Sequence, residues 1–275
     1  MARLIFILIF LTPFACSQAQ DLPQWEIGLG FAGLNLPYYR GADQSKTYLL
    51  PLPYITYRGD RLKIDDAGIH GHIFKTDRAK FDLSVSGGVP VPKDGGGARM
   101  GMPSLAPTLE LGPSLEVQLW KSPHAGQSAW LRMPLRAALA VDSPEISHQG
   151  WVFAPYLEYL FSEKANYTWS KTSVSVGPLY ADSGYHDYFY GVAPIYATAA
   201  RPEYHAQAGY SGSRITLTWQ RRVGKLWAGA FARYDNLAGA VIDDSPLLRT
   251  EEYHAVGFGI TWIIAESKKS VSAAP

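Results

Sequence analysis

The residues of this sequence that could do chemistry are a few histidines and carboxylates. His70 and His72 are two positions apart, so they would share one face of a strand, and Asp66 precedes them. These three residues could hold a metal ion, but two histidines without a third definite ligand are more often solvated polar residues. His186 stands beside Asp187, and no Ser–His pair has the spacing of a nucleophile and its base. The sequence therefore predicts a protein that is not an enzyme, with no metal and no cofactor.

Four other charges stand in neighbouring apolar stretches that read as strands. With a turn centred near His124, Glu116 lies opposite Arg132, and the next hairpin places Arg136 near Glu158. All four side chains would point inward, where opposite charges on adjacent strands attract. We hypothesise that these two pairs fill and brace a narrow lumen. The alternative is a path for small solutes with an acidic and basic lining.

The elements that position these charges are strands, because bulky apolar residues alternate with small or polar ones. The last such ladder covers 255–264, and its apolar face spans about ten residues, the length that a tilted strand needs to cross a bilayer. Similar ladders recur upstream with aromatic residues near their ends, where membrane interfaces place them. We therefore predict an all-β fold, an antiparallel transmembrane β-barrel. The apolar residues of the last ladder are Val256, Phe258, Ile260, Trp262 and Ile264.

The expected strand number depends on the stretch 61–74. A single strand there gives eleven strands, whereas a tight hairpin at Asp65 to Gly68 gives twelve. An even number places both termini in the periplasm and the long loops outside, so we prefer about twelve strands, with ten as the fallback. Pro51 and Pro53 weaken the strand prediction for 48–57, because each proline removes a ladder donor. The expected external loops are 35–46, 90–104, 142–150, 179–207 and 236–249.

Three segments divide the chain. Residues 1–19 have a charged start, a short apolar core and a small residue at Ala19, the pattern of a secretory signal peptide. Cys16, the one cysteine, would leave with it, so no disulfide is expected; Pro13 argues against the alternative of a lipoprotein signal. The barrel would cover 20–265, and a polar tail, 266–275, could engage periplasmic partners. The formal charge of +1 gives no reason to expect a nucleic-acid partner.

The segment 179–207 is the longest irregular stretch and is rich in aromatic residues. Tyr185, Tyr188, Phe189 and Tyr190 would lie in this external loop. They could form an adhesive or ligand-binding surface. The alternative is that they pack on one another and close the top of the barrel.

Several short stretches follow one another in a particular order and spacing: Leu29–Gly30, Pro37–Asp43, Leu50–Pro53, Tyr188–Val192, Tyr204, Gly209, Asp243–Leu247 and Gly257–Gly259. Together they resemble the MltA-interacting protein family (MipA/OmpV) over nearly the whole chain after the signal. The resemblance implies a Gram-negative outer-membrane barrel in contact with lipid, a scaffold joining a murein lytic transglycosylase to a penicillin-binding protein. A channel or porin and an adhesin are the alternatives. Such barrels usually end on an aromatic residue, whereas this last strand ends at Ile263–Ile264, so Trp262 would serve instead. No partner-binding residue can be assigned from the resemblance.

Overall fold

The protein is described by a computed structural model. It covers residues 21–59, 62–65, 68–71, 74–76, 78–93, 97–123, 126–165 and 168–272. The predicted signal peptide, 1–19, lies outside these residues, as do Asp66 and His72.

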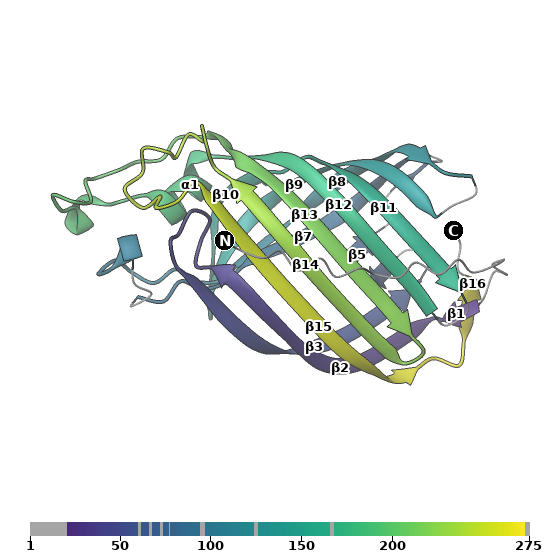
Figure 1. Ribbon diagram of the computed structural model, residues 1–275. Helices are drawn as coiled ribbons and strands as arrows, with labels where there is room; N and C mark the ends of the chain where they lie inside the picture. The colour runs from purple at the N-terminus through teal and green to yellow at the C-terminus, as the bar shows by residue number, and fades with distance from the viewer. Residues whose placement is uncertain are drawn as a thin grey trace, which may run out of the picture.

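Antiparallel strands make up most of the described chain and wrap round as a tilted barrel (Figure 1). Strands β2 to β15 belong to one 14-stranded sheet. The first of them along the chain, β2, pairs with the last, β15. The all-β, antiparallel part of the fold prediction is confirmed. Among the described residues, no helix is both long and apolar enough to cross a membrane.

The bounds of the strands follow the order of the chain. The first half comprises β1 (Asp21–Pro23), β2 (Trp25–Pro37), β3 (Ser45–Arg58), β4 (Leu62–Asp65), β5 (Gly68–Gly71), β6 (Phe74–Lys75), β7 (Ala79–Gly88) and β8 (Thr108–Lys121). The second half comprises β9 (Gln127–Asp142), β10 (Glu145–Phe153), β11 (Tyr156–Ala165), β12 (Thr168–Ala181), β13 (Gly209–Val223), β14 (Leu226–Asn236), β15 (Glu252–Glu266) and β16 (Ser270–Ser272). The helices are α1 (Ser183–Tyr190) and two short 3₁₀ turns, η1 (Gly97–Arg99) and η2 (Pro194–Tyr196).

The alternation along each strand sets the two faces of the wall. On β15 the bulky residues from Val256 to Ile264 are exposed, whereas Ala255, Gly257 and Thr261 are buried on the inner face. The same outward exposure of apolar side chains occurs on β2, β11, β12 and β13. The outer face of the barrel is thus apolar, the reverse of a water-soluble sheet protein.

The hairpin expected at Asp65 to Gly68 is present, because β4 and β5 pair with Asp65 opposite Gly68. β10 and β11 both pair with β9 on one side and with β12 on the other. They therefore form one line of strand that is interrupted at Ala154 and Pro155. β3 runs unbroken through its two prolines beside β2, and in the described chain its other edge is paired only at Tyr57 and Arg58. Prolines are tolerated there because an edge strand needs fewer ladder donors.

Two expected loops contain regular structure. β9 and β10 extend to Asp142 and Glu145, so a tight turn replaces most of the loop expected at 142–150. Within 179–207, β12 continues to Ala181 and α1 follows it. The Asp182 side chain begins this helix by accepting a hydrogen bond from the Tyr185 N–H at 2.9 Å. The sequence signal for this helix was Asp182, because aspartate is a favoured N-cap residue and stands here just before residues that a helix tolerates.

The two ends of the barrel differ. Figure 1 shows α1 and the long connections at one end, hereafter the loop end, and β1 and β16 at the other, hereafter the turn end. Part of the polar tail is ordered there, since Ser270–Ser272 pairs with Asp21–Pro23.

Gly30 stands where the first and last strands of the sheet approach closely. A Cβ atom built on Gly30 would lie 1.8 Å from the Ile260 carbonyl oxygen on β15. We expect Gly30→Ala to force β2 away from β15 and to cost about 3 kcal/mol of stability. The measure is the fraction of refolded protein that keeps heat-modifiable migration on a gel. Gly87→Ala is the control, because its nearest neighbour is 3.0 Å away; equal folded fractions for the two variants would contradict the expectation.

Candidate functional site

A line of charges runs along the inner face of the wall, over the neighbouring strands β7, β8, β9 and β11. Lys80, Glu116 and Arg132 face one another in register. Glu116 Oε2 lies 2.8 Å from Lys80 Nζ and 2.5 Å from Arg132 Nη1. The Arg132 Nε–H donates to Glu158 Oε2 at 2.8 Å. Glu116, Arg132 and Glu158 thus form one network, to which sequence reasoning had not assigned Lys80, although its alternation with Phe81 placed it on the inner face.

Arg136 has a different partner from the one expected. Its Nε–H donates to Glu110 Oε2 at 3.1 Å, and its Nη1 donates to Ser84 Oγ at 3.2 Å. The tight turn between β9 and β10 sets this register, because it places Arg136 opposite Val152 rather than beside Glu158. The predicted pairing of Arg136 with Glu158 is corrected accordingly.

A cavity of about 390 Å³ remains beside these charges. Its walls are the inner faces of β7, β8, β9, β11, β12 and β13. Hydroxyl and charged side chains predominate there, including Lys171, Ser173, Arg214 and Thr218. This half of the lumen can solvate a polar solute, whereas a nonpolar one would find few contacts in it.

A second cluster closes the loop end around one buried carboxylate. Asp235 on β14 has no exposed surface. Its Oδ1 accepts from Arg214 Nε at 2.9 Å and lies 3.3 Å from Arg40 Nε, while its Oδ2 lies 2.9 Å from Arg233 Nε. Arg40 also donates to Ser211 Oγ at 3.0 Å. One carboxylate on β14 therefore ties Arg214 of β13 and Arg233 of β14 to Arg40 in the segment between β2 and β3.

A third cluster lies at the turn end. Glu26, fully buried, contacts Arg58 at 2.8 Å and Arg222 at 2.5 Å through its two carboxylate oxygens. Arg58 also donates to the Pro23 carbonyl at 2.7 Å. The sequence analysis did not single out these three residues. The available signal was Glu26 itself, which alternates with Trp25 and Ile27 and so had to face inward.

The four aromatic residues predicted for the external loop lie on α1 and pack inside the loop end. Tyr185 and Tyr190 are buried, and Tyr188 and Phe189 are partly buried. Their hydroxyls tie the helix to the barrel: Tyr185 donates to Glu110 Oε1 at 3.2 Å, Tyr188 to the Ala106 carbonyl at 2.9 Å and Tyr190 to the Arg40 carbonyl at 2.8 Å. Burial raises the pKa of Tyr190 well above its ordinary value, so this hydroxyl remains a donor at any physiological pH.

Tyr39 continues the same aromatic core from the segment between β2 and β3. Its ring lies edge-on to that of Tyr190, with 6.0 Å between the centroids. Its hydroxyl donates to the Leu247 carbonyl at 2.7 Å, and burial raises its pKa to about 12. Buried neighbours from four connections, among them Val91, Leu237 and Ile242, complete the cluster. The loop end is thus a small packed core and not a set of free loops.

His186 on α1 gives this core a pH dependence. Its Nδ1–H donates to the Gln207 carbonyl at 2.6 Å, and its buried Nε2 has no partner among the described residues. Burial lowers the pKa of His186, against the opposing effect of the Gln207 carbonyl. Protonation would place a second N–H on Nε2 where no acceptor lies, so the neutral form stabilises the fold. This contribution is complete above the unfolded-state pKa of about 6.5 and is lost as pH falls below it.

We therefore expect the loop end to open more readily at pH 5.5 than at pH 7.5. Limited proteolysis by trypsin, which can cut at Arg201 in the adjoining connection, should be several-fold faster at the lower pH after correction for the activity of trypsin. His186→Asn keeps a donor for Gln207 and does not titrate, so its cleavage should not change with pH. An equal pH response in both proteins would refute the assignment to His186.

The metal hypothesis on His70, His72 and Asp66 falls outside the described side chains. Within the side chains that the structure does describe, no group of three or more histidine, cysteine, aspartate or glutamate residues is placed to hold a metal ion.

Comparison with known proteins supplies the family. No curated protein matches the sequence. Among solved structures, one described as "Bacterial polysaccharide outer membrane secretin" is 9% identical, with a TM-score of 0.45 over 89% of this chain and 100% of that one. The family model described as "MltA-interacting protein MipA" matches residues 29–264, from β2 to β15. The chain therefore belongs to the MltA-interacting protein family.

Proposed function

We propose that this protein spans the outer membrane of a Gram-negative bacterium and serves as a scaffold for peptidoglycan-remodelling enzymes. A belt of exposed apolar residues on the strands supports the membrane setting, because a soluble barrel would not expose so many of them. Phe31, Phe258 and Trp262 belong to this belt and are all more than half exposed. Outer-membrane lipid is then the medium around the wall.

The strand count belongs to the same proposal. β10 and β11 share both neighbours, and β6 follows β5 after two residues. When each of these pairs is counted as one strand, the wall of the barrel has about twelve strands. An even number returns both ends of the barrel to the same side. This side is the turn end, where β1 pairs with β16, and it would face the periplasm.

Membership of the MltA-interacting protein family is the observation that carries the scaffold role. The family name points to a lytic transglycosylase as one partner, and the earlier resemblance adds a penicillin-binding protein. A static body fits this role, since ion pairs join neighbouring strands of the wall and a packed aromatic core closes the loop end. The turn end presents the polar ribbon of β1 and β16, which lies where a periplasmic partner could reach it.

Affinity capture tests the scaffold directly. The barrel, purified in detergent, is immobilised and exposed to a periplasmic and membrane extract, with an unrelated barrel of similar size as the control. Recovery of a lytic transglycosylase or a penicillin-binding protein above the control supports the role, and equal recovery rejects it. A variant ending at Lys269 removes β16, and Ile195→Ser at the loop end is its matched surface control. Loss of capture in the first variant alone would place the partner at the turn end.

A path for small solutes is the second candidate, and the polar cavity of about 390 Å³ favours it. Planar-bilayer conductance separates the two candidates. The scaffold predicts no conductance above that of the empty bilayer, because Arg132 and its two glutamates occupy the lumen. Conductance in the unmodified barrel, with a further rise in Arg132→Ala, would favour the channel.

An adhesin is the remaining candidate from sequence. Tyr185 and Tyr190 are buried and could not contact a host surface. Adhesion would require the exposed tips of the loop end, such as Ile195 and Met100. Binding to host cells that is lost in Ile195→Ser would favour it.

A further inference from the structure

Among the described strands, the ladder of the barrel wall is interrupted between β3 and β7, and this interruption is called the seam below. Within the described chain, the edge of β3 from Ser45 to Ile55 has no strand partner on the side away from β2. The β4 strand pairs with β3 only at Tyr57 and Arg58. The remaining edge is roughly 36 Å long at the rise of a strand, and no described strand pairs with it.

The other side of the seam is β7. Its ladder to β6 covers Phe81 and Lys80, and β5 lies against the same end. Towards the loop end, Leu83–Gly88 has a ladder partner only in β8 among the described strands. The seam is therefore widest on the loop side of the barrel.

Both faces of β3 are accessible beside this seam. Leu49 faces outward and is 75% exposed, and Leu50, on the inner face opposite Ala32, is 43% exposed. Ala255, on the inner face of β15, is by contrast only 1% exposed. The inner face of β3 is thus open beside the seam.

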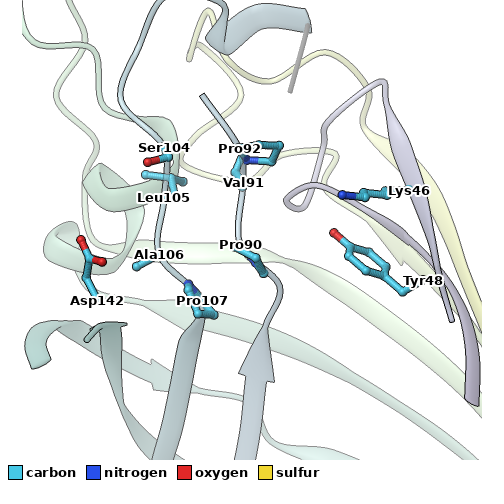
Figure 2. A pocket seen from close by; sticks show the side chains of 10 residues that line it. All are labelled: Lys46, Tyr48, Pro90, Val91, Pro92, Ser104, Leu105, Ala106, Pro107 and Asp142. Atoms are coloured by element: carbon cyan, nitrogen blue, oxygen red, sulfur yellow. The ribbon is translucent and has the colours of Figure 1, made fainter. Parts of the chain in front are cut away.

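A cleft of about 300 Å³ lies at the loop end of the seam (Figure 2). Lys46 and Tyr48 of β3 form one side, and Pro90–Pro92 with Ser104–Pro107 form the other. Asp142 lies at the rim opposite Lys46. Lys46 Nζ sits 5.3 Å from the centroid of the Tyr48 ring and makes no ion pair with any described residue.

The inner wall that continues from this cleft is apolar. Glycines on β15 leave room for large side chains of nearby strands: Leu52 of β3 and Trp227 of β14 meet over Gly259, and Leu34 of β2 and Phe231 of β14 meet over Gly257. Tyr54 extends this surface, with its ring 5.9 Å from that of Trp227. The lumen therefore has an apolar half beside the seam and a charged half on β7 to β13.

We infer that the seam admits one long-chain carboxylate of the fatty-acid type, with its carboxylate at Lys46 and its chain along Tyr48, Leu50 and Leu52. The positive Lys46 complements the head, and the apolar inner face of β3 complements the chain. In a membrane the molecules that reach this opening sideways are lipids. An added peptide strand fits less well, because Pro51 and Pro53 can donate no hydrogen bond from this edge. The inference rests on the transmembrane setting proposed above and is independent of the scaffold role.

Binding of cis-parinaric acid, a fluorescent long-chain carboxylate, tests the inference. The full barrel in detergent micelles should bind it saturably at one site. Leu50→Asn should weaken binding about tenfold, because an amide would face the chain. Its matched control is Leu135→Asn, at an outward position with 42% exposure on the closed wall, which should bind as the unmodified protein does. Heat-modifiable migration confirms that each variant is folded.

The head group is tested separately. Lys46→Gln should weaken binding of the acid several-fold and leave binding of its methyl ester unchanged. Non-saturable binding, or equal affinity in Leu50→Asn and Leu135→Asn, would show mere partition into the micelle and overturn the inference. Saturable capture of a synthetic β-strand peptide, blocked by no carboxylate, would overturn it in favour of strand addition. Partner capture can fail while binding of the acid persists, so the scaffold and the acyl site are judged independently.

Discussion

Asp235→Asn is expected to lower the free energy of unfolding by about 3–5 kcal/mol, the usual cost of removing one partner from a buried ion pair. The side chain keeps its shape but loses the charge that Arg40, Arg214 and Arg233 share. Three guanidinium groups would then repel one another around a side chain that has no exposed surface. No other described carboxylate forms ion pairs with as many arginines, so the effect should be the largest of any single carboxylate change.

The loss should begin at the loop end. Arg40 belongs to the segment between β2 and β3, and its carbonyl accepts the Tyr190 hydroxyl of α1. When Asp235 no longer holds Arg40, the aromatic core around Tyr39 and Tyr190 loses its anchor to the wall. We expect the connections of the loop end to become sensitive to protease at urea concentrations that leave the strands folded.

Urea unfolding of the barrel in lipid vesicles measures the effect, with tryptophan fluorescence for the whole barrel and trypsin cleavage for the loop end. Asp243→Asn is the matched control, because Asp243 is exposed in the connection before β15 and should change stability by less than about 0.5 kcal/mol. If both variants unfold at the same urea concentration, the cluster around Asp235 does not stabilise the loop end.

Glu26→Gln should have an effect of similar size, about 3–5 kcal/mol, at the opposite end of the barrel. Glu26 is fully buried between Arg58 and Arg222, which come from β3 and β13. An uncharged amide can accept from one arginine but leaves both positive charges without compensation. Because Arg58 also holds the Pro23 carbonyl, the pairing of β1 with β16 should loosen first.

The same unfolding experiment measures this variant, with hydrogen exchange of the β1 and β16 amides as the local reading. Glu252→Gln is the control, since this glutamate is exposed at the start of β15. Faster exchange in β1 and β16 for Glu26→Gln alone is the expected result. If exchange stays at its original rate while the global stability falls, Glu26 acts on the barrel as a whole and not on the ribbon at its turn end.

The two clusters also bear on the proposed function. The Asp235 cluster holds the loop end closed, and the Glu26 cluster holds the β1–β16 ribbon to the wall. If partner capture depends on the ribbon, Glu26→Gln should reduce it and Asp235→Asn should not. The two changes lie at opposite ends of the barrel and share no partner, so their effects on stability should add.

Local pattern was sufficient to predict the strands. Alternation with period two is a property of each strand alone, so the faces of β15, β8 and β9 followed from residue order. The pairing of Glu116 with Arg132 also followed, because a short turn leaves little freedom in the register of a hairpin. The hairpin at Asp65 and Gly68 was predicted from the same kind of local pattern. Helix α1 was not predicted, because its N-cap residue, Asp182, stands in a stretch that was expected to be irregular.

Contacts between strands that are distant in sequence were decided only by the tertiary structure. Asp235 meets Arg40, and Glu26 meets Arg222, because the barrel closes with a particular tilt and stagger, and no local spacing encodes that stagger. The partner of Arg136 changed for a related reason: a tight turn replaced an expected loop and moved the register along β9. The seam beside β3 likewise depends on how far the β4–β5 hairpin reaches. The sequence by itself determined which residues face inward, and closure of the barrel decided which of them meet.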